Sequence, residues 1–133
     1  MIPMKHYKVV AAIIMHCDKI LCVQRGNNKF DYISNKYEFP GGKIEPGESK
    51  VEAITREINE ELNMKIIVQD EYLTVQHKYP DFEVIMYSFI CSAVDDKLIL
   101  TEHIAYKWLY KHELNSLDWA EADVPIVKNL MNT

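Results

Sequence analysis

The sequence has few of the residues that stabilise small secreted or zinc-binding domains. Its three cysteines, Cys17, Cys22 and Cys91, form no paired spacing. A disulfide framework or a zinc site is therefore disfavoured, and we expect buried thiols. No apolar run approaches the roughly 18 to 20 residues of a membrane span. The first ten residues, MIPMKHYKVV, lack the features of a secretory signal, so we expect a cytoplasmic protein with no membrane partner.

Positive charge is also scarce, because the formal net charge is −5. Binding to polymeric nucleic acid requires a basic face and is not expected. The net charge does not exclude a small phosphorylated substrate, since bound divalent cations can reverse the sign of the local electrostatic field. The 133 residues, 48% of them hydrophobic, suffice for one domain over residues 1–133, which we expect to be a monomer or a weak dimer.

The apolar segments predict a layered α/β (α+β) domain. The first run, YKVVAAIIMHC, is nearly continuous and β-branched, which is typical of a central strand buried on both faces. A polar, Asn-rich segment at 26–36 is expected to be a loop. The expected strands are 7–17, 19–25, 65–79, 82–94 and a last one within 97–110 that passes into an irregular stretch; short helices are expected at 110–117 and 123–131.

One long helix should begin just after Ser49, because Ser49 and Glu52 have the spacing of a capping box. An apolar stripe at three- and four-residue spacing should pack this helix on the sheet. The stripe consists of Val51, Ile54, Ile58 and Leu62.

Glu57, Glu60 and Glu61 fall within an arc of roughly 100° beside this stripe. Such residues are commonly just a solvated face. However, carboxylates at these spacings repel one another, and the helix dipole disfavours them near a C-terminus. Oxygen ligands of this kind suit Mg²⁺, with Mn²⁺ as an alternative. Gly41 and Gly42 precede the helix, and a backbone carbonyl there could complete the metal shell.

At these positions the chain resembles a known family. Gly42, Glu48 and the segment REINEELNM (56–64) match the Nudix box, G-x5-E-x7-R-E-U-x-E-E-x-G-U, except that Asn63 replaces the last glycine. Asn also tolerates the left-handed conformation expected there. KYEFPGGKIEPGE further resembles the MutT-like branch of Nudix hydrolases, in motif closest to bacterial CTP pyrophosphohydrolases and 8-oxo-dGTP diphosphatases. The resemblance implies a mixed sheet sandwiched between helices, with the box at 42–64.

The resemblance also implies a metal site. Glu57, Glu60 and Glu61 would bind the cation with the Gly42 carbonyl, and Glu102 would add a carboxylate that binds metal or orients water. A surface-strand glutamate is the alternative for Glu102. The general base would be Glu60 or Glu61, with Glu102 as the alternative. Arg56, counted with the catalytic residues, would hold the box glutamates in place rather than contact substrate, and Glu48 would belong to the same ion network as a supporting residue.

For the substrate, Arg25 matches a phosphate-contacting arginine of this branch, although a solvated strand-end arginine is an equal alternative. The segment ADVP resembles CTP pyrophosphohydrolases and places Asp123 at the base-reading position. An ionised carboxylate would select hydrogen-bond donors. Asp123 could also, or instead, be the N-cap of the following helix. Phe39 and Tyr79 are candidate stacking walls, or core residues.

The resemblance implies a nucleoside triphosphate diphosphatase that releases a nucleoside monophosphate and pyrophosphate. Its substrates would be (d)CTP-type or damaged nucleotides such as oxidised dGTP, which fits sanitation of the nucleotide pool. Hydrolysis of ADP-ribose or another nucleoside diphosphate derivative is a second hypothesis. A non-catalytic nucleotide-binding module is a third, which the intact Glu57, Glu60 and Glu61 disfavour.

Overall fold

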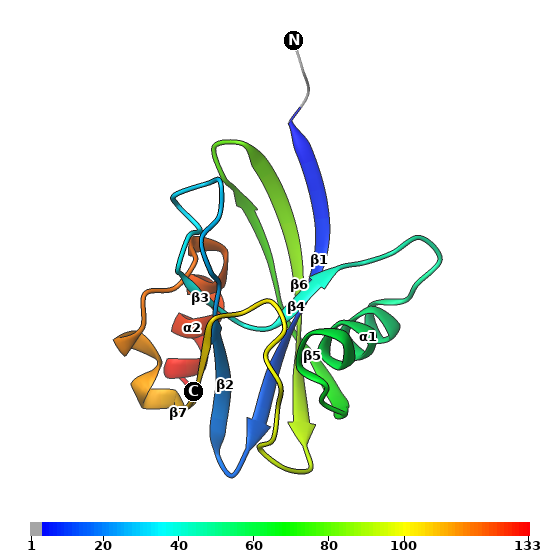
Figure 1. Ribbon diagram of the computed structural model, residues 1–133, viewed down its shortest axis with the longest axis vertical. Coiled ribbons are helices and arrows are strands. Elements are labelled where there is room, and N and C mark those ends of the chain that lie inside the picture. Colours follow the sequence, from blue (N-terminus) through cyan, green and yellow to red (C-terminus); the bar gives the residue numbers. More distant parts are fainter. Residues whose placement is uncertain (1–3) are drawn as a thin grey trace.

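A mixed seven-stranded sheet forms the centre of the molecule (Figure 1), of which the computed structural model describes residues 4–133. The order along the sheet is β3-β2-β1-β6-β5, while β4 pairs with β1 and β7 pairs with β2. The strands are β1 (Lys5–His16), β2 (Lys19–Gln24), β3 (Tyr37–Glu38), β4 (Gly41–Lys43), β5 (Ile66–Lys78), β6 (Phe82–Ala93) and β7 (Ala105–Tyr110).

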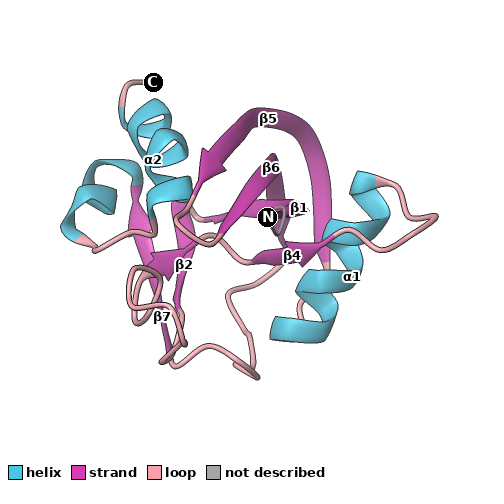
Figure 2. Ribbon diagram, turned by 90° about the horizontal axis from the view of Figure 1, so that it is seen from above, coloured by secondary structure: helices cyan, strands magenta, loops and turns pink. Residues whose placement is uncertain are grey.

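Helices cover both faces of this sheet, as Figure 2 shows from above. Helix α1 (Lys50–Leu62) lies on one side, and α2 (Val124–Met131) lies on the other with two short 3-10 helices, η1 (Lys111–Ser116) and η2 (Glu121–Asp123). The predicted sandwich of helices around a mixed sheet is therefore confirmed. Within residues 4–133, none of the helices combines the length and apolar character required to cross a membrane.

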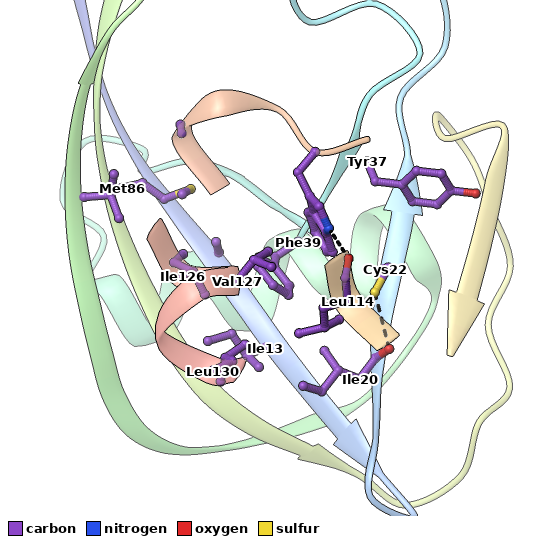
Figure 3. Packing of buried hydrophobic residues seen from close by; sticks show 14 of the residues in the cluster. Ile13, Ile20, Cys22, Tyr37, Phe39, Met86, Leu114, Ile126, Val127 and Leu130 are labelled. Carbon is purple, nitrogen blue, oxygen red and sulfur yellow. Dashed lines mark hydrogen bonds between the residues drawn. The ribbon is translucent and has the colours of Figure 1, made fainter. Parts of the chain in front are cut away.

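Strand β1 is the central strand, parallel to β6 and antiparallel to β2 and β4. Its alternate side chains enter two different cores, which explains why the run is apolar without alternation. Ala11 and Ile13 face the core beneath α2, whereas Val10 and Ile14 face the core beneath α1. Figure 3 shows Ile13 in the first of these cores, together with side chains from α2.

Helix α1 begins and ends as the sequence predicts. The Ser49 hydroxyl accepts a hydrogen bond from the Glu52 N–H at 3.1 Å, and the Glu52 carboxylate accepts one from the Ser49 N–H at 2.9 Å. Asn63 ends the helix in the left-handed conformation, with φ 52° and ψ 39°. Asn is thus a working substitute for the glycine of the motif.

Two expectations about packing are wrong. Val51 is 48% exposed, although Ala53 in the same turn of α1 is buried. Cys17 is exposed, unlike Cys22 and Cys91. It forms the β1–β2 turn with Asp18, where both residues have positive φ and the chain reverses in solvent.

The segment before β7 also differs from expectation. The predicted strand within 97–110 begins only at Ala105, and the irregular stretch precedes it rather than following it. Glu102 lies in this irregular stretch, so it is not a surface-strand glutamate. Here the backbone bonds to other elements instead of a strand ladder: Ile99 N–H donates to Leu62 O, and Ile104 N–H donates to Gln24 O, both at 2.9 Å.

Candidate active site

The loop between the sheet and α1 brings backbone and carboxylates together. Gly41 and Gly42 lie in β4, opposite Ala11 and Val10 of β1. A Cβ at Gly41 would collide with the Val10 carbonyl, and a Cβ at Gly42 would collide with the Glu57 carboxylate. Glycine is required at Gly41, where the obstacle is backbone, whereas a side chain at Gly42 would have to displace the Glu57 carboxylate. The Glu57 carboxylate is consequently held directly against the Gly42 backbone.

The three helix glutamates have unequal environments. The Glu60 side chain is 59% exposed, whereas that of Glu57 is only 14% exposed. Glu61 lies at the seam between α1 and the sheet, and its Oε2 is buried without a hydrogen-bond partner among residues 4–133. Burial, followed by the neighbouring Glu57, Glu38 and Glu102, raises the pKa of Glu61 well above its ordinary range. Excess negative charge is therefore concentrated around Glu61.

Arg56 holds several of these carboxylates. Its guanidinium donates to Glu48 Oε1 at 2.9 Å, to Glu57 Oε1 at 2.9 Å and to Glu60 Oε2 at 3.2 Å. It also donates to the Lys43 carbonyl at 3.0 Å. The bond from Arg56, with a second from the Glu45 N–H, lowers the pKa of Glu48. Arg56 is thus engaged entirely with protein groups, as its predicted supporting role requires.

The oxygen atoms of the predicted ligands are of the kind that a hard divalent cation binds. Within residues 4–133, no three Asp, Glu, His or Cys side chains converge at metal-binding distance. The unpartnered Glu61 Oε2 and the carboxylate of Glu57 against Gly42 are nevertheless oxygen donors of the kind that Mg²⁺ and Mn²⁺ bind.

Two hollows adjoin at Gly42, Lys43 and Glu61, which line both. The smaller, of about 530 Å³, is lined by all five of the predicted metal ligands. Its lining includes Gly42, Glu57, Glu60, Glu61 and Glu102. The larger, of about 750 Å³, contains the predicted substrate residues Arg25, Phe39, Tyr79 and Asp123. The two predicted sets of residues therefore form one continuous site, with Glu61 at the junction.

Asp123 lies in the wall of the larger hollow and is 4% exposed. Its Oδ1 accepts a hydrogen bond from the Phe39 N–H at 3.0 Å, and it caps no N–H of α2. The alternative that Asp123 is a side-chain N-cap is therefore wrong. The carboxylate ties η2 to the chain between β3 and β4. Burial, with the nearby Glu38, raises the pKa of Asp123 well above its ordinary value.

The two predicted aromatic residues belong to the core and to the hollow at once. Phe39 is 3% exposed and packs on Trp119 with ring centroids 4.7 Å apart. Tyr79 is 5% exposed and stacks on Tyr32 at 5.3 Å, while its hydroxyl accepts a hydrogen bond from the Ala122 N–H at 2.9 Å. Both rings are therefore fixed in place before any ligand binds.

Arg25 forms an ion pair that the sequence did not predict. Its guanidinium donates twice to Glu38 Oε1, at 3.1 and 2.9 Å, and its side chain is 44% exposed. Glu38 Oε2 lies 2.9 Å from His103 Nε2. Glu38 and His103 were assigned no role from sequence. The only available signal for Glu38 was one charged residue within the apolar stretch YEFP.

Comparison with known proteins agrees with this geometry. The model of the NUDIX domain matches residues 5–130. The chain is 32% identical to the CTP pyrophosphohydrolase of Escherichia coli K12, covering 96% of this chain and 93% of that protein. It is 25% identical to an 8-oxo-dGTP diphosphatase of Buchnera aphidicola, covering 96% of this chain and 95% of the relative.

A solved structure gives the same result. A MutT protein of the Nudix hydrolase family from methicillin-resistant Staphylococcus aureus 252 has a TM-score of 0.75 and 38% identity. The alignment covers 98% of each chain. This chain therefore belongs to the Nudix family of hydrolases. The two relatives described above, one named for CTP and one for 8-oxo-dGTP, each align with 96% of this chain.

Proposed function

We propose that this protein is a Mg²⁺-dependent nucleoside triphosphate diphosphatase, converting a nucleoside triphosphate and water to a nucleoside monophosphate and pyrophosphate. The main support for this proposal is the arrangement around Glu61, where an acidic hollow adjoins a larger hollow with aromatic walls. A nucleotide spans the same two chemistries, since its phosphates need cations and its base needs an apolar slot. The relatives named CTP pyrophosphohydrolase and 8-oxo-dGTP diphosphatase support this substrate class.

In this proposal Glu57, Glu61 and the Gly42 carbonyl hold the metal, with Glu60 and Glu102 completing the set. When bound, Mg²⁺, or Mn²⁺ in its place, neutralises phosphate oxygens and lowers the pKa of a coordinated water. The high cost of ionising Glu61 in the absence of a cation supports its assignment as a ligand. The exposed Glu60 can leave Arg56 with little loss, because solvent already reaches its side chain.

The protein's part in the reaction is to take one proton from the attacking water and to hold the phosphates in line. Glu60 or Glu61 is the proposed general base, with Glu102 as the alternative. Attack at the β-phosphorus would form a bond from water oxygen to phosphorus and break the bond to the bridging oxygen of the α-phosphate. That oxygen leaves on the nucleoside monophosphate.

The larger hollow is the proposed nucleoside site. Phe39 and Tyr79 supply its aromatic walls, and Asp123 reads the edge of the base. Arg25 would contact a phosphate with the part of its guanidinium that Glu38 leaves free. A (d)CTP-type base or an oxidised guanine would present N–H donors to an Asp123 carboxylate. Nucleotides of this kind belong to the cytoplasmic pool, where we place the protein.

A panel of nucleoside triphosphates, with one nucleoside diphosphate derivative for comparison, tests this proposal. It should contain CTP, dCTP, dGTP, 8-oxo-dGTP and ADP-ribose, each assayed with Mg²⁺ for pyrophosphate and for phosphate. We expect pyrophosphate release from a cytidine or oxidised guanine triphosphate, and no activity with EDTA. Preferred hydrolysis of ADP-ribose would contradict the proposed substrate class, and inactivity toward the whole panel would contradict the proposed reaction.

A further inference from the structure

The irregular segment 94–104 carries Glu102 to the acidic hollow. Both neighbours of Glu102 in the chain are anchored through their side chains. Thr101 Oγ1 donates to the Glu61 carbonyl at 2.9 Å, and His103 Nε2 lies 2.9 Å from Glu38 Oε2. One anchor is on α1 and the other is on β3, so Glu102 is held between two separate elements of the fold.

The His103 anchor is buried and depends on one bond. The His103 side chain is 6% exposed, and its Nδ1 finds no hydrogen-bond partner within residues 4–133. Burial alone would raise the pKa of Glu38, but the His103 hydrogen bond and the Arg25 guanidinium hold that pKa below its ordinary value. Glu38 is therefore ionised and can only accept, so Nε2 is the atom of His103 that carries the shared proton.

Glu38 is itself firmly fixed. Its other oxygen accepts two hydrogen bonds from Arg25, and its backbone pairs with Val23 of β2. The bond from His103 thus ties segment 94–104 to the body of the sheet rather than to another loop. Thr101 and Glu102 both line the acidic hollow. The Thr101 hydroxyl is already bonded to the Glu61 carbonyl, so Glu102 supplies the carboxylate of this segment at the hollow.

We propose that His103 is a positioning residue: through its hydrogen bond to Glu38 it sets Glu102 at the acidic hollow opposite Glu57 and Glu61. This inference rests on the proposed function, because it requires Glu102 to contribute to metal binding. Residues that orient a metal ligand typically account for 10- to 100-fold in affinity. His103 therefore acts on the cation through Glu102 and does not contact it.

Two polar substitutions separate this role from simple packing. In His103→Gln the amide nitrogen can occupy the place of Nε2 and still donate to Glu38. In His103→Asn the amide nitrogen can occupy only the place of Nδ1, so the bond to Glu38 is lost. The matched control is His112→Asn, on an exposed histidine that stacks on Tyr110 at 5.8 Å.

The measurement is Mn²⁺ affinity of the nucleotide-free protein, read from the electron paramagnetic resonance signal of free Mn²⁺. We expect His103→Asn to weaken Mn²⁺ binding about 10-fold, and His103→Gln to restore it to within about 3-fold of the original. His112→Asn should leave it unchanged. Unfolding midpoints of the metal-free variants show whether each is folded. If His103→Asn does not fold, His103→Gln still tests the proposal. Mn²⁺ binding about 10-fold weaker in the folded Gln variant than in the original protein would overturn it.

A double-mutant cycle with Glu102→Gln gives the sharper result. If His103 acts through Glu102, His103→Asn should weaken Mn²⁺ binding no further when Glu102→Gln is already present. An equal loss in both backgrounds, or no loss in either, would overturn the proposal. If Glu102→Gln alone leaves Mn²⁺ affinity unchanged, the inference fails while the proposed reaction is still tested independently by the nucleotide panel.

Discussion

Gly42 lies so close to Glu57 that a single methyl group on Gly42 would occupy the space of the Glu57 carboxylate. Gly42→Ala should therefore displace Glu57 and weaken Mn²⁺ binding about 10-fold, with a similar loss in Mg²⁺-dependent turnover. The control is Gly26→Ala, whose added Cβ would meet only the γ2 methyl of the exposed Ile104, at 3.1 Å. Equal Mn²⁺ affinity in the two variants would show that Glu57 does not bind the metal.

Glu61→Gln should lower turnover by about 100-fold or more, because an amide is a much poorer metal ligand and cannot serve as a base. The metal-free variant should unfold at a temperature no lower than the original protein, since the raised pKa of Glu61 shows that the fold disfavours its ionised form and glutamine cannot ionise. Nucleotide hydrolysis and thermal unfolding in EDTA measure the two effects. Glu71→Gln, on an exposed glutamate of β5, is the control. Near-normal turnover of Glu61→Gln would refute the assignment.

Asp123→Ala and Asp123→Asn should separate the structural and base-reading roles of this residue. Alanine leaves the buried Phe39 N–H unpaired, at a cost of about 1–3 kcal/mol in unfolding free energy, whereas asparagine can still accept that bond. Both should reduce discrimination between bases more than they slow a poor substrate. Relative kcat/KM values across the nucleotide panel provide the measurement. Equal slowing of every nucleotide by Asp123→Asn would make the role purely structural.

Asp123 should also make stability depend on pH. The pKa of Asp123 is raised in the folded protein, so its protonated form stabilises the fold. This contribution to the free energy of unfolding is fully present below the unfolded pKa of about 4. It is lost as the pH rises through the pKa of the folded protein. As the pH increases, the free energy of unfolding of the original protein should therefore fall by on the order of 1 kcal/mol relative to that of Asp123→Asn. Urea unfolding of both proteins at several pH values measures this. A difference independent of pH would contradict the raised pKa.

The thiols should react in the order of their exposure. Burial raises the pKa of Cys22 and of Cys91 to about 12, so neither forms thiolate near neutral pH, whereas Cys17 lies in an exposed turn. With a thiol reagent at pH of about 8, we expect one fast reaction per folded chain and three after unfolding. Cys17→Ser should abolish the fast reaction, and a second fast thiol would indicate that a core opens.

Local patterns in the sequence predicted local features well. The capping box at Ser49, the left-handed Asn63 and the acidic arc of α1 each depend on residues within a few positions, and the structure contains all three. The central position of β1 was likewise evident, because a strand with two buried faces leaves an unbroken apolar run. Val51 is exposed although it belongs to the apolar stripe, because helical periodicity gives the direction of a side chain and not what packs against it.

What could not be predicted depends on pairs far apart in the chain. Glu38 and His103 are separated by 65 positions, and their bond follows from the placement of segment 94–104 against β3. No periodicity encodes that placement. The bond from Asp123 to the Phe39 N–H spans 84 positions and replaced the local capping interaction that the sequence also allowed. For Asp123, a tertiary hydrogen bond decided between two alternatives that the sequence left open.

The parallel pairing of β1 with β6 has a consequence for synthesis of the chain. Lys5 pairs with Phe82 and Met15 with Ser92. The central strand β1 therefore cannot form its parallel pairing until β6, 77 residues further along the chain, has been synthesised. Until β6 leaves the ribosome, the apolar β1–β2 hairpin lacks half of its sheet, and its open edge is free to pair with another nascent chain. We therefore expect folding to be delayed until most of the polypeptide has been translated, which makes rapid chain release and chaperone protection important for its yield.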